Sequence, residues 1–143
     1  MNPEIWGPHY WFVIHTIAFN YPNKPNVIEK KSYYKFIQDL PLFIPDKKSS
    51  RNFTEILKIY PVLPYLDNRK DFLKWTHFVH NRVNESLGKD QISLKDFYIG
   101  YFNNYKTSTE KSKDNLRDRK IKLYILTVIM FLIISYYISN KKL

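Results

Sequence analysis

The chain of 143 residues contains no cysteine. This absence excludes disulfide bonds, thiolate metal sites and a thiol nucleophile within the chain itself. Glycine is also scarce, with three residues against twelve tyrosines, ten phenylalanines and three tryptophans. Such a composition favours packed helices over a fold rich in glycine turns and loops. Because hydrophobic residues make up 44% of the chain, a folded core is expected and a disordered chain is excluded.

Acidic residues are fewer than basic ones, 13 against 23, which gives a formal net charge of +10. The excess is uneven: residues 1–105 hold fourteen basic and ten acidic residues, whereas residues 106–122 hold seven and three. Lys141 and Lys142 add two more positive charges at the end. A nucleic-acid-binding protein would concentrate positive charge on its folded domain. The distribution instead indicates charges that flank a membrane segment, and no nucleic-acid partner is expected.

One uncharged apolar run, LYILTVIMFLIISYYI, occupies residues 123–138. As a helix it would span about 24 Å, slightly less than the roughly 30 Å of a typical hydrocarbon core. Flanking lysines such as Lys122 can extend their stems and close the gap. The alternative is a buried core helix, but the run has no polar face and follows the charged segment 106–122. We predict a transmembrane helix at 123–138, a basic linker or solvated helical extension at 106–122, and a short tail at 139–143.

Basic residues are more numerous before the apolar run than after it. The positive-inside bias therefore predicts a single-pass, tail-anchored protein whose N-terminal domain is cytosolic. No apolar signal segment precedes Trp6, so secretory targeting from that end is not expected. The short span would suit a thin bilayer such as the endoplasmic reticulum.

The N-terminal residues 1–105 contain apolar positions at helical spacing and no long stretch with the period-two alternation of strands. Helices are predicted at about 8–20, 26–40, 47–59, 67–87 and 93–105. Pro8 should open the first helix, Asp46 and Asp67 should cap the third and fourth, and Gly88 should end the fourth. The predicted fold class is all-α: a four-helix bundle with a short fifth helix, followed by the transmembrane helix.

Two segments carry motifs that are specific beyond helix formation. Residues 6–22 read WGPHYWFVIHTIAFNYP, and residues 72–89 read FLKWTHFVHNRVNESLGK. They resemble the Erv/ALR family of FAD-linked sulfhydryl oxidases, whose opening helix carries Trp-x-x-x-His and a Tyr-Pro ending. That family's signature is His-Asn-x-Val-Asn followed by Leu-Gly-Lys. The resemblance covers about 100 of the 143 residues, and the Trp-Gly-Pro start is similar to short members from large DNA viruses.

The resemblance implies that FAD lies in the mouth of the helical bundle. Whether this chain holds FAD at that site is left open. The residues implied to bind it are Trp11, His15, Tyr21, His80, Asn81, Val83, Asn84, Lys89 and Tyr101. Aromatic rings can sandwich a flavin or adenine ring, His and Asn can satisfy its heteroatoms, and a lysine can supply charge near a pyrophosphate. Taken singly, each residue could instead be an ordinary core or surface side chain. No metal site is predicted among the four histidines, since no acidic or thiol ligand stands beside them.

The sequence departs from the family at its redox centre. Where the family has Cys-x-x-Cys at the start of the third helix, this chain has Asp46 and Ser49, and Asn52 stands where a His is common. The positions of a second family disulfide align with Lys58 and His77. Dithiol oxidation needs one thiolate to exchange with substrate and a second to attack the flavin. Neither a carboxylate nor a hydroxyl can replace sulfur, so no catalytic residue is predicted.

The sequence therefore predicts a catalytically silent, sulfhydryl-oxidase-like protein with a binding or structural role at a membrane. The viral resemblance favours a virion component, in an inner membrane or one derived from the endoplasmic reticulum, whose bundle binds a capsid protein. The resemblance also implies a homodimer or a dimer with an active paralogue. The alternative is an FAD-binding thiol oxidase module whose cysteines are supplied by a partner.

Overall fold

The structure is a computed structural model that describes residues 1–140, and within this range all regular elements are helices. The chain divides into two compact units, Met1–Tyr101 and Phe102–Leu143. Of the tail predicted at 139–143, residues 141–143 lie outside the described part. The all-α prediction, with a bundle followed by a C-terminal apolar helix, is confirmed.

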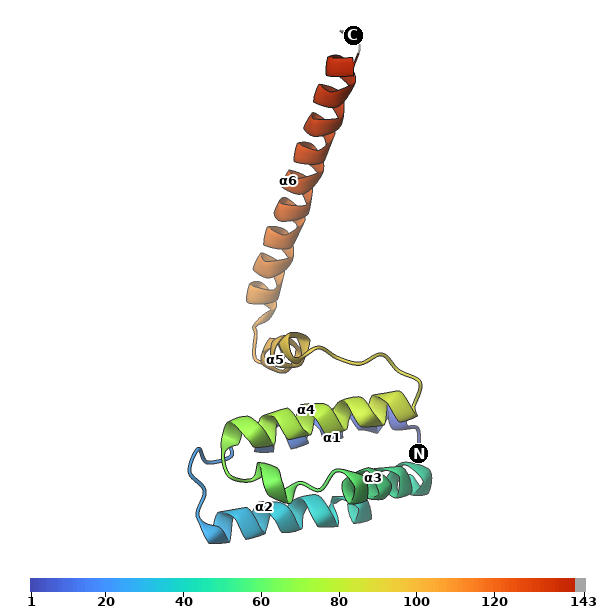
Figure 1. The fold of residues 1–143 in the computed structure, drawn as a ribbon, viewed down its shortest axis with the longest axis vertical. Helices are drawn as coiled ribbons and strands as arrows, with labels where there is room; N and C mark the ends of the chain where they lie inside the picture. Colours follow the sequence, from blue (N-terminus) through green and yellow to red (C-terminus); the bar gives the residue numbers. More distant parts are fainter. Residues whose placement is uncertain (141–143) are drawn as a thin grey trace. The chain divides into compact units, whose positions relative to one another are not determined.

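Four α-helices and a short fifth helix build the first unit, together with two 3₁₀ turns (Figure 1). Their order is α1 (Pro3–Phe19), α2 (Val27–Asp39), η1 (Leu40–Phe43), α3 (Lys47–Ile59), η2 (Leu63–Tyr65), α4 (Arg69–Ser86) and α5 (Leu94–Asn103). Helix α4 packs against both α1 and α3. Helices α1 and α4 are antiparallel, because Lys89 beyond the end of α4 pairs with Glu4 at the start of α1.

Helix α1 begins at Pro3, not at Pro8 as the sequence pattern predicted. The Asn2 side chain accepts a hydrogen bond from the Glu4 N–H at 2.9 Å, and a proline follows at the first helical position, where it loses no hydrogen bond. Pro8 lies inside the helix and leaves one backbone carbonyl without its usual partner. The earlier start adds Trp6 to the helix, and its side chain contributes to the site described below.

The start of α4 is capped by Asn68 and not by Asp67, which corrects the second capping prediction. Asn68 Oδ1 accepts from the Asp71 N–H at 2.9 Å, while Asp67 forms an ion pair with Lys30 at 2.6 Å. Asp and Asn are both favourable N-cap residues, and here the side chain of Asn68 makes the capping bond. The predicted cap of α3 by Asp46 is confirmed.

The core of the first unit is continuous and draws on each of its five α-helices. Tyr21, Ile37, Phe72 and Leu66 are fully buried, and Tyr21 packs edge-on against Phe72 with ring centroids 5.0 Å apart. The indole N–H of Trp75 donates to a backbone carbonyl, so this largest core side chain is also satisfied. The packed core fixes α1, α3 and α4 as the frame of the site.

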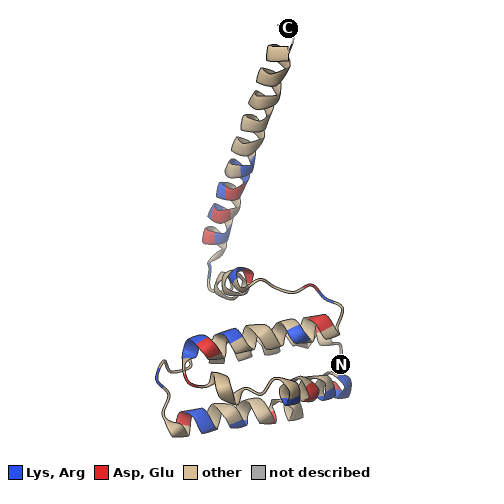
Figure 2. Cartoon of the chain, viewed as in Figure 1, with Lys and Arg blue, Asp and Glu red and all other residues tan. Residues whose placement is uncertain are grey.

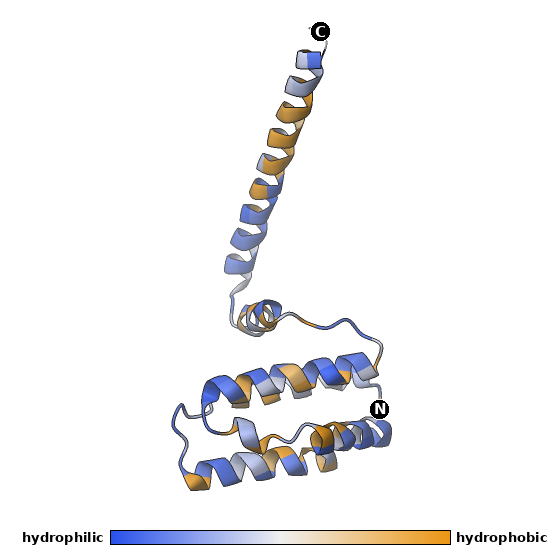
Figure 3. Ribbon diagram, viewed as in Figure 1, coloured by the Kyte–Doolittle hydropathy of each residue, from blue (hydrophilic) through white to orange (hydrophobic). Residues whose placement is uncertain are grey.

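The second unit is dominated by α6 (Ser108–Asn140), a single helix of 33 residues with no buried residue. Its C-terminal half is strongly apolar (Figure 3), and its N-terminal half carries the charged residues (Figure 2). Among the described residues, this is the one helix long and apolar enough to cross a membrane. Residues 108–122 and the apolar run at 123–138 are thus parts of the same helix.

Candidate functional site

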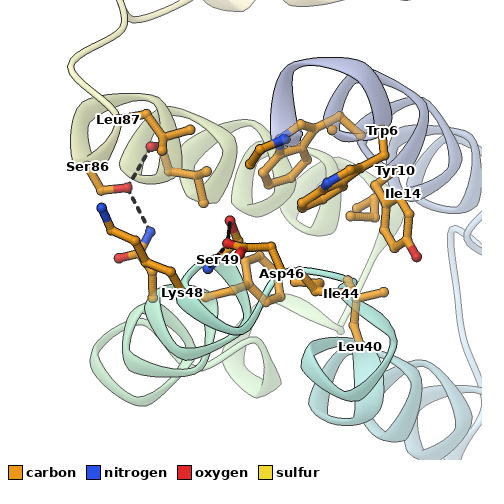
Figure 4. Close-up of a pocket in the computed structure, with 16 residues that line it drawn as sticks. Trp6, Tyr10, Ile14, Leu40, Ile44, Asp46, Lys48, Ser49, Ser86 and Leu87 are labelled. Atoms are coloured by element: carbon orange, nitrogen blue, oxygen red, sulfur yellow. Dashed lines mark hydrogen bonds between the residues drawn. The ribbon is translucent and has the colours of Figure 1, made fainter. Parts of the chain in front are cut away.

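A cavity of about 320 Å³ lies between α1, the start of α3 and the end of α4 (Figure 4). Its volume is in the range of small-molecule sites, and most of its wall is apolar. The lining residues are Pro3, Trp6, Gly7, Tyr10, Trp11, Ile14, Leu40, Ile44, Asp46, Lys48, Ser49, Asn52, Phe53, Val83, Ser86 and Leu87. The two positions that replace the family's cysteines are therefore both on the cavity wall.

Asp46 and Ser49 form a hydrogen-bonded pair on that wall. One carboxylate oxygen of Asp46 accepts from the Ser49 hydroxyl at 2.7 Å and from the Ser49 N–H at 2.8 Å. These two bonds hold the pKa of the Asp46 carboxyl below its usual value, so the group is an anion at neutral pH. The pair caps the helix as its sequence predicted, and it contains no group that could exchange with a disulfide.

A short polar chain joins α3 to α4 at the rim of the cavity (Figure 4). The Asn52 side-chain amide donates to the Ser86 hydroxyl at 2.7 Å, and that hydroxyl donates to the Val83 carbonyl at 2.7 Å. Asn52, at a position where the family often has a histidine, is thus bonded within the protein. The contact ties the start of α3 to the last turn of α4.

Behind the cavity wall, three of the predicted cofactor residues form one aromatic cluster. The Trp11 ring stacks on His80 with centroids 4.1 Å apart and an interplanar angle of 14°. His15 lies beside both, 5.6 Å from Trp11 and 5.2 Å from His80. Phe97 of α5 closes this cluster with its ring edge-on to His15 at 4.6 Å. Helices α1, α4 and α5 therefore converge on the two histidines.

Both histidines are uncharged at neutral pH. Burial, with smaller contributions from the neighbouring His80 and His77, lowers the pKa of His15 to about 3. Burial also lowers the pKa of His80 to about 4, with a smaller contribution from His77. A cluster of neutral rings can face the uncharged edge of a flavin or adenine without a charge penalty.

Three buried nitrogens have no hydrogen-bond partner within the described residues: Trp6 Nε1, whose side chain lines the cavity, and His15 Nε2 and His80 Nδ1 behind the cavity wall. An unsatisfied buried polar group costs about 1–3 kcal/mol, so such groups are rare, and a bound ligand or an ordered water can satisfy them. Together with the aromatic cluster, these nitrogens fit a planar heteroaromatic group that offers both acceptors and donors. The residues present thus fit the FAD implied by the sequence motifs.

Asn81 and Asn84 are buried as a cofactor site would require, but their hydrogen bonds link them to the loop after α4. The Asn81 amide binds the Ile92 backbone twice, donating to the Ile92 carbonyl at 2.9 Å and accepting from its N–H at 2.8 Å. Asn84 accepts through its backbone carbonyl from the Lys89 N–H at 2.9 Å. The His-Asn-x-Val-Asn motif therefore anchors the loop after α4, and neither asparagine lines the cavity.

Tyr21 and Tyr101 also make their contacts within the protein. The Tyr21 hydroxyl donates to the Leu66 carbonyl at 2.7 Å inside the core. The Tyr101 ring stacks on Phe19 at 4.2 Å, and its hydroxyl donates to Thr16 at 3.1 Å. Of the nine predicted cofactor residues, only Trp11 and Val83 line the cavity directly. His15 and His80 contact Trp11 from behind, and the cofactor roles of all nine stay predictions.

Sequence reasoning missed most of the cavity wall. Trp6 had a signal in the Trp-Gly-Pro start, but Tyr10, Ile14 and Phe53 read as ordinary apolar helix positions. Their role depends on how α1 and α3 pack, which no local pattern encodes. No group of three or more His, Asp or Glu side chains within residues 1–140 is arranged to hold a metal ion.

Comparison with known proteins agrees with the motifs. The profile of the Erv1 / Alr family matches residues 8–117. "Probable FAD-linked sulfhydryl oxidase R368" of Acanthamoeba polyphaga mimivirus is 31% identical over 144 residues, which cover 100% of this chain and 99% of that protein. "FAD-linked sulfhydryl oxidase erv2" of Schizosaccharomyces pombe is 29% identical over 77% of this chain, and the match spans 56% of its own length.

A solved structure shares the fold of the first unit. The FAD binding domain of Erv1 from Saccharomyces cerevisiae superposes with a TM-score of 0.61 at 24% identity, covering 65% of this chain and 87% of that one. At this identity the likeness establishes the fold alone. The family profile covers more than half of the chain, and the mimivirus protein matches its whole length. The chain therefore belongs to the Erv1 / Alr family.

Proposed function

We propose that this protein is a catalytically silent member of the Erv1 / Alr family with a binding or structural role at a membrane. The observation that carries the proposal is the Asp46–Ser49 pair on the cavity wall, bonded at 2.7 Å in a chain without cysteine. Transfer of electrons from a dithiol requires a reversible covalent bond between protein and substrate sulfur. A hydrogen-bonded carboxylate and hydroxyl cannot form it.

FAD binding is part of the proposal, because the site retains groups that fit the cofactor. Trp11 and Val83 would contact it from the cavity wall, and the neutral His15 and His80 would support the Trp11 ring from behind. When bound, FAD supplies a two-electron acceptor. The residues of this chain would hold and shield it without delivering electrons to it, so that the cofactor would mainly stabilise the fold.

The proposed location is a membrane, reached through the apolar half of α6 with the first unit on the cytosolic side. The support is the exposed apolar run of α6 and the basic residues that precede it. The whole-length match to a mimivirus protein favours a virion component in an inner or endoplasmic-reticulum-derived membrane, with a capsid protein or an active paralogue as partner.

Self-association is proposed through a second groove, between α1 and the end of α2 with the η1 turn. It has a volume of about 320 Å³ and is lined by His9, Tyr10, Val13, Ile14, Phe36, Leu40 and Phe43. Val13 is 52% exposed and Phe43 is 67% exposed, so large apolar groups face away from the core. Sedimentation of the full chain in detergent should give a dimer, and Val13→Glu should give a monomer. A wild-type monomer at high concentration would remove this part of the proposal.

The first test is a visible absorption spectrum of the full chain purified in detergent. We expect a flavin band that persists when a reduced, unfolded dithiol protein is added under anaerobic conditions. The matched variant Asp46→Cys/Ser49→Cys restores the two thiols, and its flavin band should bleach under the same conditions. Bleaching of the wild-type band by the dithiol protein alone would refute the catalytic silence.

The second candidate function is a flavin-binding oxidase module that works with cysteines from a partner. The retained Trp11–His80 stack and the unpaired histidine nitrogens favour it, because they fit a cofactor that has no redox partner in this chain. It predicts that the wild-type flavin bleaches only when a cysteine-bearing partner is added with the dithiol substrate. A colourless, folded protein would reject both FAD binding and this second candidate.

A further inference from the structure

The charges of the second unit are distributed unevenly along the chain that leads to the apolar run (Figure 2). Residues 106–118 carry four basic and three acidic side chains. The next four residues, 119–122, carry three basic side chains and no acidic one. Net positive charge is therefore concentrated in the last helical turn before residue 123, where the apolar run begins.

Two of the three acidic residues of the preceding segment are engaged, and the third, Asp118, forms no ion pair among the described residues. Glu110 accepts from the Thr107 N–H and from its hydroxyl, both at 2.8 Å. Asp114 pairs with Lys106 at 2.7 Å and with Arg117 at 3.3 Å. The two ion pairs of Asp114 compensate part of the positive charge of this earlier segment, in which Lys111 and Lys113 form no ion pair among the described residues.

The three cations of the last turn are not compensated in this way. No ion pair among the described residues involves Arg119, Lys120 or Lys122. At about 100° per residue they point in three different directions around the helix axis. They thus form a basic collar around α6, defined here as these three residues, and not a stripe on one face.

Distance along the helix separates the collar from the earlier lysines. At 1.5 Å per residue, the collar lies within about 6 Å of the apolar run, whereas Lys111 and Lys113 lie about 15–18 Å away. The Debye length at physiological ionic strength is about 8 Å. An anionic membrane surface would therefore attract the collar strongly and the two earlier lysines only weakly.

We propose that the collar binds anionic phospholipid headgroups in the leaflet at the N-terminal end of the apolar run, so that the anchor selects its lipid neighbours. This inference rests on the proposed membrane anchoring of α6. A lipid surface is favoured over RNA because three of the four net positive charges of residues 106–122 lie in one turn beside the run, while the longer segment preceding that turn is nearly neutral. An RNA footprint would need cations spread along that segment.

The test uses the full chain reconstituted in phosphatidylcholine vesicles with 20% phosphatidylserine. Spin-labelled analogues of both lipids report their relative association with the protein. The variant Lys120→Gln/Lys122→Gln removes two collar charges, and Lys111→Gln/Lys113→Gln removes the same two charges with the same spacing farther from the run. Lys141 and Lys142 are unchanged in every protein and add a common background.

We expect the wild type to prefer phosphatidylserine by about fivefold at low salt, falling toward equal association in 1 M salt. The collar variant should lose most of this preference, and the distal variant should keep it. Equal losses in both variants, or no preference in the wild type, would overturn the inference. So would an RNA oligonucleotide that binds the wild type and is lost in the collar variant while the lipids associate equally.

Insertion is measured in the same samples by resistance to alkaline extraction. A chain that is extracted would overturn the membrane anchoring and the collar together. A chain that stays inserted but shows no lipid preference would overturn the collar alone.

Discussion

The two units of this protein place the same kinds of side chain in opposite environments. In the first unit Phe72 and Ile37 are fully buried, whereas in α6 Phe131 is 72% exposed and Leu132 is 61% exposed. Apolar residues on α4 recur every three or four positions and leave a polar face, so the helix can pack against α1 and α3 on one side. The apolar half of α6 is hydrophobic all round. Periodicity, and not hydrophobicity alone, distinguishes a helix that packs one face on a protein core from one whose apolar side chains are exposed on all sides.

The largest effect is expected from charges placed in the apolar half of α6. Ile129→Lys/Ile133→Lys should abolish membrane association, because each lysine near the centre of a span costs about 2.5–3.5 kcal/mol. Alkaline extraction and vesicle flotation measure the loss. The control Ile129→Leu/Ile133→Leu should stay in the membrane, and equal behaviour of the two variants would contradict a transmembrane role.

Removing one aromatic ring from each unit compares the two environments directly. Phe72→Ala should lower the free energy of unfolding of the first unit by about 3–5 kcal/mol, because it opens a cavity in the packed core. Phe131→Ala should leave that free energy unchanged. Urea denaturation of the full chain in detergent, followed by tryptophan fluorescence, measures both. A similar destabilisation by the two changes would mean that α6 packs on the core in solution.

Acid should destabilise the first unit through its two buried histidines. The pKa values of His15 and His80, about 3 and about 4, lie below the 6.5 of an exposed histidine. Between these values the unfolded chain binds more protons than the folded chain. The free energy of unfolding is therefore highest above pH 6.5 and decreases as the pH falls toward the folded-state pKa values. The loss from pH 7 to pH 5 is at most about 2 kcal/mol per histidine.

Chemical denaturation at both pH values measures this dependence on histidine protonation. His80→Phe should reduce the difference between pH 7 and pH 5 by about half, and His9→Gln, a change at an exposed histidine of α1, should preserve it. An unchanged difference in His80→Phe would show that other groups control the acid sensitivity.

The smallest expected changes in stability come from substitutions at two neighbouring residues at the start of α4. Asn68→Ala should cost about 1 kcal/mol, because it removes the side-chain bond to the Asp71 N–H. Asp67→Ala should cost less, because its pair with Lys30 is at the surface and Asp67 is 74% exposed. Thermal unfolding of both variants ranks them, and the reverse order would restore Asp67 as the cap.

Several features of the site were accessible from sequence because they depend on local patterns. Asp46 precedes a helix whose apolar residues are spaced by three and four, and the structure confirms it as the cap. The family motifs pointed to Trp11, His15 and His80, which the fold brings into one cluster. The early start of α1 was missed, because Pro8 resembles a helix opening although Asn2 already supplies the cap.

The sequence by itself determined the helical class, the apolar run of α6 and the absence of any sulfur chemistry at the family's redox positions. These follow from composition and from periodicity along one chain. Only the tertiary structure decided that Asp46 and Ser49 face a cavity, that Asn81 holds Ile92, and that one ring nitrogen each of His15 and His80 is buried without a partner among the described residues. These depend on which helices meet, and that is set by the packing of residues far apart in sequence.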